Sequence, residues 1–542
     1  MKDKRPAIVV LATLGCLLPF LNKAFHIDDP LFLWVGENIQ RNPFDFYNFP
    51  VNWDGREMPM WALTENPPLV GYYIALVTTL LGWSERALHA GFLVPACAAA
   101  LGVFHLAGQL CSRPLLAALA AILTPVFIVC STGVMCDMTM SAFWVWAAFL
   151  WVRGTKQRND RDLLIGALLI AAMALTKYFA IILVPILGLY SALTTRKPGR
   201  WIALLLLPMA ALLAYTIAFK LHYGLNPLAK AAAFSKHAHS VDGTTLLGKA
   251  LVGFAFCGGC LASALWFLPL LWPGRKAALS WLGGVLLVAL AARAAGVPVL
   301  AEDRGGSWPL SLQFVALATG GVAVLLLALQ DAWEPRGADS ILLLTWVLGP
   351  LLFSMLFNWA VNGRTLLPLF PAVGILIARR VSRVDPGRRA VSVALAGSAA
   401  LAMAAAYADA SMANASRDAA FSISRQMDGR PMWFDGHFGF QYYTQKLGGK
   451  PLVSGRAAPA PGEIIVVPET NTYVIDKIPP ERLEVLGILG ARSCSWMATM
   501  NPHAGAGFYS HFFGSLPYVF AAVAPERYVL YKWLARAPSK PS

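Results

Sequence analysis

Two adjacent carboxylates, Asp28 and Asp29, follow the first hydrophobic stretch of the chain, in the segment His26-Ile27-Asp28-Asp29-Pro30. Neighbouring carboxylates at a membrane surface are costly to keep and have no packing use. They could deprotonate an acceptor hydroxyl, stabilise an oxocarbenium-like sugar or hold a divalent metal. They could also begin a helix, because Asp followed by Pro is typical of a helix N-terminus. Both roles can hold together, with Asp29 capping the helix and Asp28 taking part in the chemistry.

Three further charged residues stand at the ends of hydrophobic stretches. Asp137 begins one of them, and an ionisable residue at that depth is a functional candidate, although it could equally cap a helix. Lys177 and Arg364 are isolated cations in apolar surroundings, and an isolated cation favours an anionic partner. A lipid phosphate is the anion at hand, so we predict that both residues bind phosphate. Snorkelling of the long side chains to the interface is the alternative.

Other candidate motifs predict less. His237 and His239 have a His-x-His spacing, but no further ligand spacing supports a metal site. Cys257 and Cys260 bracket two glycines in hydrophobic surroundings, which is typical of close helix packing. The sequence contains no glycine-rich phosphate loop, metalloprotease motif or Ser–His–Asp signature. A reaction would therefore draw its energy from a preactivated donor, with no cofactor required and a divalent metal left open.

The composition is that of an integral membrane protein. Of the 542 residues, 57% are hydrophobic and 13% are charged, and the mean hydropathy is +0.57. Soluble domains carry about 25% charged residues. The net charge of +15 could suggest a nucleic-acid partner. Because Lys and Arg collect in short clusters between hydrophobic stretches, as they do in cytoplasmic loops, we expect the bilayer as a partner and no nucleic acid.

The hydrophobic stretches predict a polytopic α-helical membrane protein with about thirteen transmembrane helices. Their approximate bounds are 7–25, 86–110, 114–131, 137–152, 162–176, 178–194, 200–219, 247–271, 278–296, 309–330, 339–357, 364–380 and 389–407. A further apolar stretch, 67–82, is short and begins with two prolines. If it crossed the membrane, the later basic clusters would lie outside, so we predict that it is interfacial or re-entrant and that the N-terminus is cytoplasmic.

An odd number of spans places the end of the chain outside the cytoplasm. We predict a transmembrane domain over 1–409, with an extracytoplasmic catalytic loop at 26–85, and a small extracytoplasmic α/β domain over 410–542. In that second domain we expect strands at 431–434, 463–467 and 527–533, and helices at 439–447 and 480–489. The same topology gathers the charged candidates on the outer face of the membrane.

Several short segments, taken in order, resemble those of a known family. They are the acidic pair after the first span, Pro-Pro-Leu at 67–69, Cys-Asp-Met-Thr-Met at 136–140, Ala-Leu-Thr-Lys at 174–177 and Gly-Arg-Thr-Leu-Leu-Pro at 363–368. Their order and spacing resemble glycosyltransferases of the C superfamily. The nearest group is that of the bacterial dolichyl-phosphate-mannose-protein mannosyltransferase-like proteins, which include the aminoarabinose transferases of lipid A. The resemblance covers about residues 5–410, and the tail segment 433–443 resembles the soluble end of many bacterial members.

The resemblance implies an inverting transfer of a sugar from a polyprenyl-phosphate donor to an acceptor hydroxyl. The reaction would take place on the outer face of the bacterial cytoplasmic (inner) membrane. The family's general base maps onto Asp28, with Asp29 where Glu is usual, and its second acidic residue maps onto Asp137. Its two phosphate-binding cations map onto Lys177 and Arg364.

Two positions depart from the family pattern. Asn66 precedes Pro-Pro-Leu where the family often has His or Lys, and Thr365 follows the arginine where Tyr is frequent. The first change removes a charge, so the resemblance implies that Asn66 is a donor-phosphate contact without charge.

The acceptor could be a protein, a lipid or another glycan. A glycan ligase that acts on polyprenyl-linked oligosaccharide would share the membrane architecture and is one alternative. A lipid or sugar transporter without transferase activity is another. Transporters often have paired halves and charges near the membrane midplane, and the sequence shows no internal repeat and places its charges at span ends.

Overall fold

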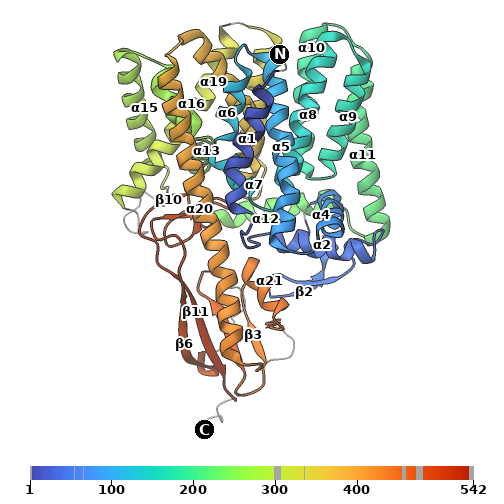
Figure 1. The fold of residues 1–542 in the computed structure, drawn as a ribbon, viewed down its shortest axis with the longest axis vertical. Helices are drawn as coiled ribbons and strands as arrows, with labels where there is room; N and C mark the ends of the chain where they lie inside the picture. The colour runs from blue at the N-terminus through green and yellow to red at the C-terminus, as the bar shows by residue number, and fades with distance from the viewer. Residues whose placement is uncertain are drawn as a thin grey trace.

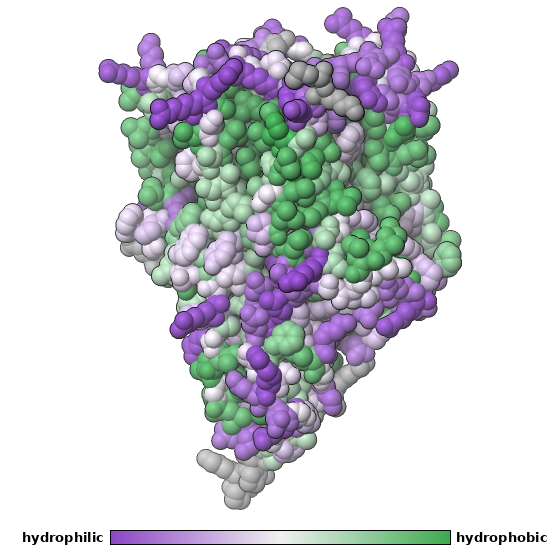
Figure 2. All heavy atoms as spheres, in the orientation of Figure 1, coloured by the Kyte–Doolittle hydropathy of each residue, from purple (hydrophilic) through white to green (hydrophobic). Residues whose placement is uncertain are grey.

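The computed structural model describes residues 3–53, 55–64, 66–297, 307–334, 336–454, 459–470 and 480–535. Helices form a broad body, and the C-terminal residues extend from one end of it (Figure 1). On the face shown in Figure 2, hydrophobic side chains form a band across the body, hydrophilic ones lie at the far rim, and the C-terminal region carries both kinds. Leucines such as Leu213 and Leu286 are exposed within that body. This distribution is that of a multi-span membrane protein.

Every stretch predicted to cross the membrane is helical. The body contains α1 (Arg5–Leu17), α5 (Glu85–Leu110), α6 (Pro114–Ile122), α7 (Pro125–Ser131), α8 (Cys136–Gln157), α9 (Asp160–Ala174), α10 (Leu183–Thr195), α11 (Arg200–Tyr223), α13 (Leu246–Cys260), α14 (Ser263–Leu271), α15 (Arg275–Ala294), α16 (Trp308–Trp333), α17 (Ala338–Leu356), α19 (Phe370–Val384) and α20 (Arg388–Met427). Among the described residues, eight helices are long and apolar enough to cross a membrane, or up to ten if each bent pair is one span. The predicted count of thirteen is therefore not confirmed.

Proline explains the bend in the predicted span 114–131. α6 ends at Ile122 and α7 begins at Pro125, and the two helices meet at 65°. Proline donates no backbone hydrogen bond, and it disfavours helical geometry in the residue before it. The bend directs α7 into the turn 132–135, which precedes Asp137 at the start of α8.

A layer of shorter elements covers the end of the body that faces the C-terminal region (Figure 1). It contains α2 (Asp29–Arg41), β1 (Pro50–Asn52), β2 (Glu57–Pro59), α3 (Met60–Leu63), α4 (Leu69–Leu81) and α12 (Pro227–Asp242). α4 has 13 residues, fewer than the roughly 20 that a spanning helix needs, and its interfacial or re-entrant position stays a prediction. Gly36 of α2 and Gly71 of α4 let these two helices touch, because a Cβ at either would strike the other helix.

The C-terminal region contains, among its described residues, a five-stranded sheet of order β4-β3-β5-β11-β6. Its elements are β3 (Met432–Phe434), α21 (Phe438–Lys446), β4 (Lys450–Pro451), β5 (Ile464–Pro468), β6 (Leu483–Ala491) and β11 (Glu526–Trp533). β3 runs parallel to β4 and β5, whereas β11 runs antiparallel to β5 and β6. The three predicted strands and the predicted helix 439–447 are confirmed.

The predicted helix at 480–489 is wrong. A single 3₁₀ turn, Pro480–Arg482, leads directly into β6, which pairs with β11 along its whole length. Val485 and Ile488 favour a strand and Gly487 weakens a helix, and pairing with the edge of β11 outweighs the weak helical periodicity of the segment.

A single helix joins the body to the C-terminal region. α20 has 40 residues and continues without a break past the predicted domain boundary at 409/410. It packs on α7 and α14 in the body and on α21 in the C-terminal region. The C-terminal region is thus fixed to the body by continuous backbone.

Close contact between α13 and α16 depends on glycine. A Cβ on Gly258 would collide with the backbone oxygen of Leu317, and a Cβ on Gly321 would collide with that of Phe254. The Cys-Gly-Gly-Cys segment is thereby confirmed as a helix-packing motif, and its cysteines are buried and free.

We predict that Gly258→Val lowers the free energy of unfolding by about 3 kcal/mol, because the added atoms force two backbones apart. Gly284→Val on α15 is the matched control, since nothing lies within 4 Å of a Cβ there. Thermal unfolding of the detergent-purified proteins measures both. Equal melting temperatures for the two variants would contradict the packing.

Candidate functional site

Four of the sequence-predicted residues meet as two ion pairs. Nη1 of Arg364 lies 2.7 Å from Oδ2 of Asp28, and Nζ of Lys177 lies 2.6 Å from Oδ1 of Asp137. Arg364 and Asp137 also attract each other electrostatically, so the two pairs are neighbours. We call these four residues the charged cluster. It unites four separate segments of the chain at the end of the body that faces the C-terminal region.

Their sequence context suggests that Lys177 and Arg364 are isolated cations. In the structure both are paired. Each is paired with a carboxylate that is distant in sequence, by 40 residues for Lys177 and by 336 for Arg364. Arg364 also contacts Sδ of Met135 at 3.1 Å, and its Nε has no hydrogen-bond partner among the described residues. Arg364 therefore retains donor capacity beyond its bond to Asp28.

A strained turn sets the direction of Asp28. Ile27 has a φ of 49°, in the left-handed region that a β-branched residue rarely adopts, and it is buried. α2 begins immediately afterwards at Asp29-Pro30, where proline suits the first helical turn. Asp28 occupies the N-cap position without a side-chain cap bond, and its carboxylate reaches Arg364. Its side chain is 26% exposed, so a ligand has access to it.

Asp29 has a different role from the predicted helix cap. Its Oδ2 accepts a hydrogen bond from the backbone N–H of His26 at 2.8 Å, and its Oδ1 accepts one from that of Val134 at 2.9 Å. It is fully buried, and this burial raises its pKa to about 7, although Lys23 opposes the shift. Asp29 thus fastens the turn that holds Asp28 to the turn that precedes Asp137.

Asp137 lies in the first turn of α8, where the helix dipole favours an anion. It is buried, and its Oδ2 has no hydrogen-bond partner among the described residues. Lys177 projects from the junction between α9 and the 3₁₀ helix Tyr178–Ile182, with Nζ 5.6 Å from the ring centre of Phe179. The second pair is therefore a buried carboxylate with one oxygen still available.

Asn66 lies beside the charged cluster but contacts none of its charged groups directly. Its Oδ1 is 3.7 Å from Sγ of Cys136, the neighbour of Asp137, and its backbone oxygen accepts a hydrogen bond from Tyr47. The predicted contact of Asn66 with a donor phosphate stays a prediction.

No group of three or more His, Cys, Asp or Glu side chains that could hold a metal exists in the described part of the chain. His239, in the predicted His-x-His pair, contacts Nζ of Lys249 through Nδ1 at 2.6 Å.

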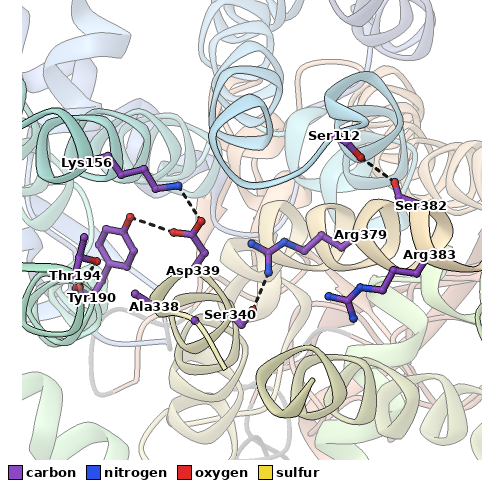
Figure 3. Close-up of a pocket in the computed structure, with 11 residues that line it drawn as sticks. Ser112, Lys156, Tyr190, Thr194, Ala338, Asp339, Ser340, Arg379, Ser382 and Arg383 are labelled. Carbon is purple, nitrogen blue, oxygen red and sulfur yellow. Dashed lines mark hydrogen bonds and ion pairs between the residues drawn. The ribbon is translucent and has the colours of Figure 1, made fainter. Parts of the chain in front are cut away.

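A hollow of about 570 Å³ lies at the other end of the body (Figure 3). Lys156 of α8 lines this hollow, and it is separated from Asp137 at the start of the same helix by about 29 Å along the helix axis. There Lys156 and Tyr190 both bond Asp339, and Arg379 bonds Ser340 (Figure 3). Its lining includes none of the charged cluster.

Residues that sequence reasoning missed lie directly beneath the charged cluster. Asp409 is fully buried and paired with Lys23, and Tyr509 lies under the guanidinium of Arg364. Asp409 had a signal in the sequence, since it is a carboxylate at the end of the apolar stretch 389–407. Tyr509 had none, because its position becomes informative only when the C-terminal segment packs on Arg364.

The pKa of Asp29 predicts how stability depends on pH. Folding raises this pKa from 3.8 to about 7, so the stabilisation is complete below pH 4 and is lost as the pH rises through 7. Burial lowers the pKa of His26 to about 4, which affects stability only below pH 6.5. We predict a loss of about 1 kcal/mol between pH 6.5 and 8, measured by thermal unfolding. Asp29→Asn should lack this loss, and an unchanged slope would contradict the assignment.

One segment of the chain is similar to a known protein family. Residues 65–222 match the family described as dolichyl-phosphate-mannose-protein mannosyltransferase. This segment includes Asn66, Asp137 and Lys177, whereas Asp28 and Arg364 lie outside it. Among curated proteins, none matches the sequence.

Two solved structures have a similar course of the chain. The Archaeoglobus fulgidus oligosaccharyltransferase, tethered to an acceptor peptide, is 13% identical with a TM-score of 0.48, over 84% of this chain and 64% of that one. The chain therefore spans less than two thirds of that protein. ArnT from Cupriavidus metallidurans bound to undecaprenyl phosphate is 14% identical with a TM-score of 0.46, over 90% and 96% of the two chains. The family match over residues 65–222 confirms, for that segment, the resemblance to dolichyl-phosphate-mannose-protein mannosyltransferase-like proteins.

Proposed function

We propose that the protein moves a sugar from a polyprenyl-phosphate donor to an acceptor hydroxyl by a single displacement with inversion. The observation that supports this most is the charged cluster, in which two carboxylates and two cations from four segments meet at one end of the body. The description of the family that residues 65–222 match names a sugar donor carried on a lipid phosphate, which agrees with this chemistry. A protein, lipid or glycan acceptor suits the site equally well.

Asp28 is the general base in this proposal, and Asp29 holds it in place. Asp28 is accessible, whereas both oxygens of the buried Asp29 are taken by backbone N–H groups. Asp28 accepts the proton of the acceptor hydroxyl while that oxygen forms a bond to the anomeric carbon. The bond from this carbon to the phosphate breaks, and the electron pair leaves with the polyprenyl phosphate. One displacement without a covalent intermediate inverts the configuration.

Arg364 and Lys177 bind the phosphate, whose charge grows as it leaves. Fixed cations stabilise that charge more in the transition state than in the ground state. Because Arg364 bonds Asp28, an arriving phosphate competes with that carboxylate for the guanidinium. The exchange frees Oδ2 of Asp28 to accept the hydroxyl proton. The donor thereby prepares the base for its own reaction.

The distribution of charge supports an orientation for this reaction. Basic clusters such as 153–161 and 379–389 lie at the end of the body opposite the charged cluster. The positive-inside rule places those clusters in the cytoplasm. We therefore place the charged cluster and residues 410–542 on the outer face of the bacterial cytoplasmic membrane.

Asp28→Asn should reduce sugar transfer by about 10²–10⁴-fold, the usual contribution of a general base. Membranes with wild-type or variant protein are supplied with radiolabelled polyprenyl-phosphate sugars, and the label that leaves the lipid is followed. Asp385→Asn, which breaks an exposed ion pair with Arg113, is the control and should transfer normally. Transfer by Asp28→Asn at the wild-type rate would remove Asp28 as the base.

Arg364→Gln should weaken binding of undecaprenyl phosphate about 10–100-fold, because a charge-assisted hydrogen bond contributes roughly 1.5–3 kcal/mol. Arg364→Lys should recover part of the affinity, since it keeps the charge but loses the planar fork. Purified protein in lipid nanodiscs gives the dissociation constants. Arg113→Gln is the control for loss of a paired arginine, and equal affinities for Arg113→Gln and Arg364→Gln would contradict the assignment.

A further inference from the structure

A buried network of charge lies beneath the charged cluster. Asp409, near the middle of α20, is fully buried and accepts three hydrogen bonds. Nζ of Lys23 donates to it at 2.6 Å, and the hydroxyls of Tyr509 and Thr499 each donate at 2.9 Å. These residues come from three parts of the chain: the end of the first helical segment, α20 and the C-terminal region. We call them the Asp409 network.

The Asp409 network reaches both partners of the first ion pair. The guanidinium of Arg364 lies 5.7 Å from the ring centre of Tyr509, a cation–π arrangement. On the other side, Nζ of Lys23 also donates to Oγ1 of Thr132. Thr132 begins the turn in which Val134 binds Asp29, the residue next to Asp28. The network therefore supports Arg364 directly and Asp28 through one turn.

The C-terminal region also holds the backbone around Arg364. The N–H of Gly363 donates to the carbonyl of Phe508 at 2.8 Å, and the N–H of His511 donates to that of Val361 at 3.0 Å. A Cβ on Gly363 would meet the ring of Phe508 at 2.7 Å, so the contact is close. The segment 508–511 thus lies against the turn that presents Arg364.

Stability alone is a weak explanation for this network. Two buried charges lose their hydration, and their attraction recovers little more than that loss. A buried apolar pair of similar size would stabilise the fold equally well or better. The direct contact of Tyr509 with Arg364 gives the network a role that an apolar pair could not perform.

We propose that Tyr509, anchored by Asp409 and Lys23, is a positioning residue that orients Arg364 for the donor phosphate. The C-terminal region is then part of the phosphate site, besides any role in choosing the acceptor. This inference rests on the proposed function for its ligand. Its structural part, the dependence of Arg364 on Tyr509, can be tested without a ligand.

The first measurement is the affinity of nanodisc-embedded protein for undecaprenyl phosphate. Tyr509→Leu removes the ring and the anchor and should weaken binding at least 10-fold. Tyr509→Phe keeps the ring but loses the hydroxyl bond to Asp409, so it should weaken binding by an intermediate factor of about 3-fold. A merely structural tyrosine would lower the melting temperature in both variants and leave affinity unchanged in the folded protein, which would overturn the proposal.

A second ion pair, far from the charged cluster, serves as the control for removal of the Lys23–Asp409 pair. Lys23→Met with Asp409→Asn removes both buried charges, while the amide oxygen introduced on α20 can still accept a hydrogen bond from one hydroxyl. This double variant should fold yet bind at least 3-fold more weakly. Lys156→Met with Asp339→Asn removes a 2.8 Å pair at the opposite end of the body and should bind as the wild type does. Equal affinities for the two double variants would overturn the proposal.

The second measurement needs no ligand. Thermal unfolding is compared for Tyr509→Leu, for Arg364→Gln and for the protein that carries both of these substitutions. Because Tyr509 contacts Arg364, Tyr509→Leu should lower the melting temperature at most half as much when Arg364 is already replaced. Additive shifts would overturn the inference. If the wild type fails to bind undecaprenyl phosphate, the proposed donor is rejected, and this cycle alone decides whether Tyr509 orients Arg364.

Discussion

The cost of unpaired charge in a hydrophobic surrounding is the constraint on which the arrangement of this site depends. Water solvates an isolated carboxylate or guanidinium, and a buried one must find a partner in the protein. Each charge of the cluster satisfies this requirement with a residue from another segment. Four segments must therefore meet: the turn with Asp28, the start of α8, the start of α18 (Gly363–Leu366) and the junction at Lys177. Electrostatics thereby fixes the relative position of helices that packing alone could place in several ways.

The buried charges also explain why the C-terminal region is an integral part of the body. Asp409 lies within α20 and obtains two of its three donors from residues 499–509. Without those residues a fully buried carboxylate would keep Lys23 as a partner and lose both hydroxyls. The 40-residue helix and the backbone contacts around Gly363 add a rigid connection at the same place. Removal of the C-terminal region would therefore disturb Arg364 as well as the surface that an acceptor meets.

The residues of this site could be predicted from the sequence, but their arrangement could not. Asp28, Asp137, Lys177 and Arg364 could be singled out because ionisable residues at the ends of apolar stretches are expensive, and this physical rule needs no structure. Their pairing could not be predicted, because it depends on how helices far apart in sequence pack. Asp409 satisfied the same rule and could have been found. The helix expected at 480–489 is a strand because β11 offers it a pairing edge, which is a property of the fold and not of the segment.

Charge balance shows how the two ion pairs suit the proposed displacement. Two carboxylates and two cations sum to zero, and a bound phosphodiester brings the site to −1. As the acceptor proton moves to Asp28, the two cations and the remaining carboxylate sum to +1. At the same time the phosphate changes from −1 to −2. The protein therefore gains positive charge as the leaving group gains negative charge, and the site total stays at −1. Since charge in a site of low dielectric is costly to change, this match favours a base that is itself a member of the paired cluster.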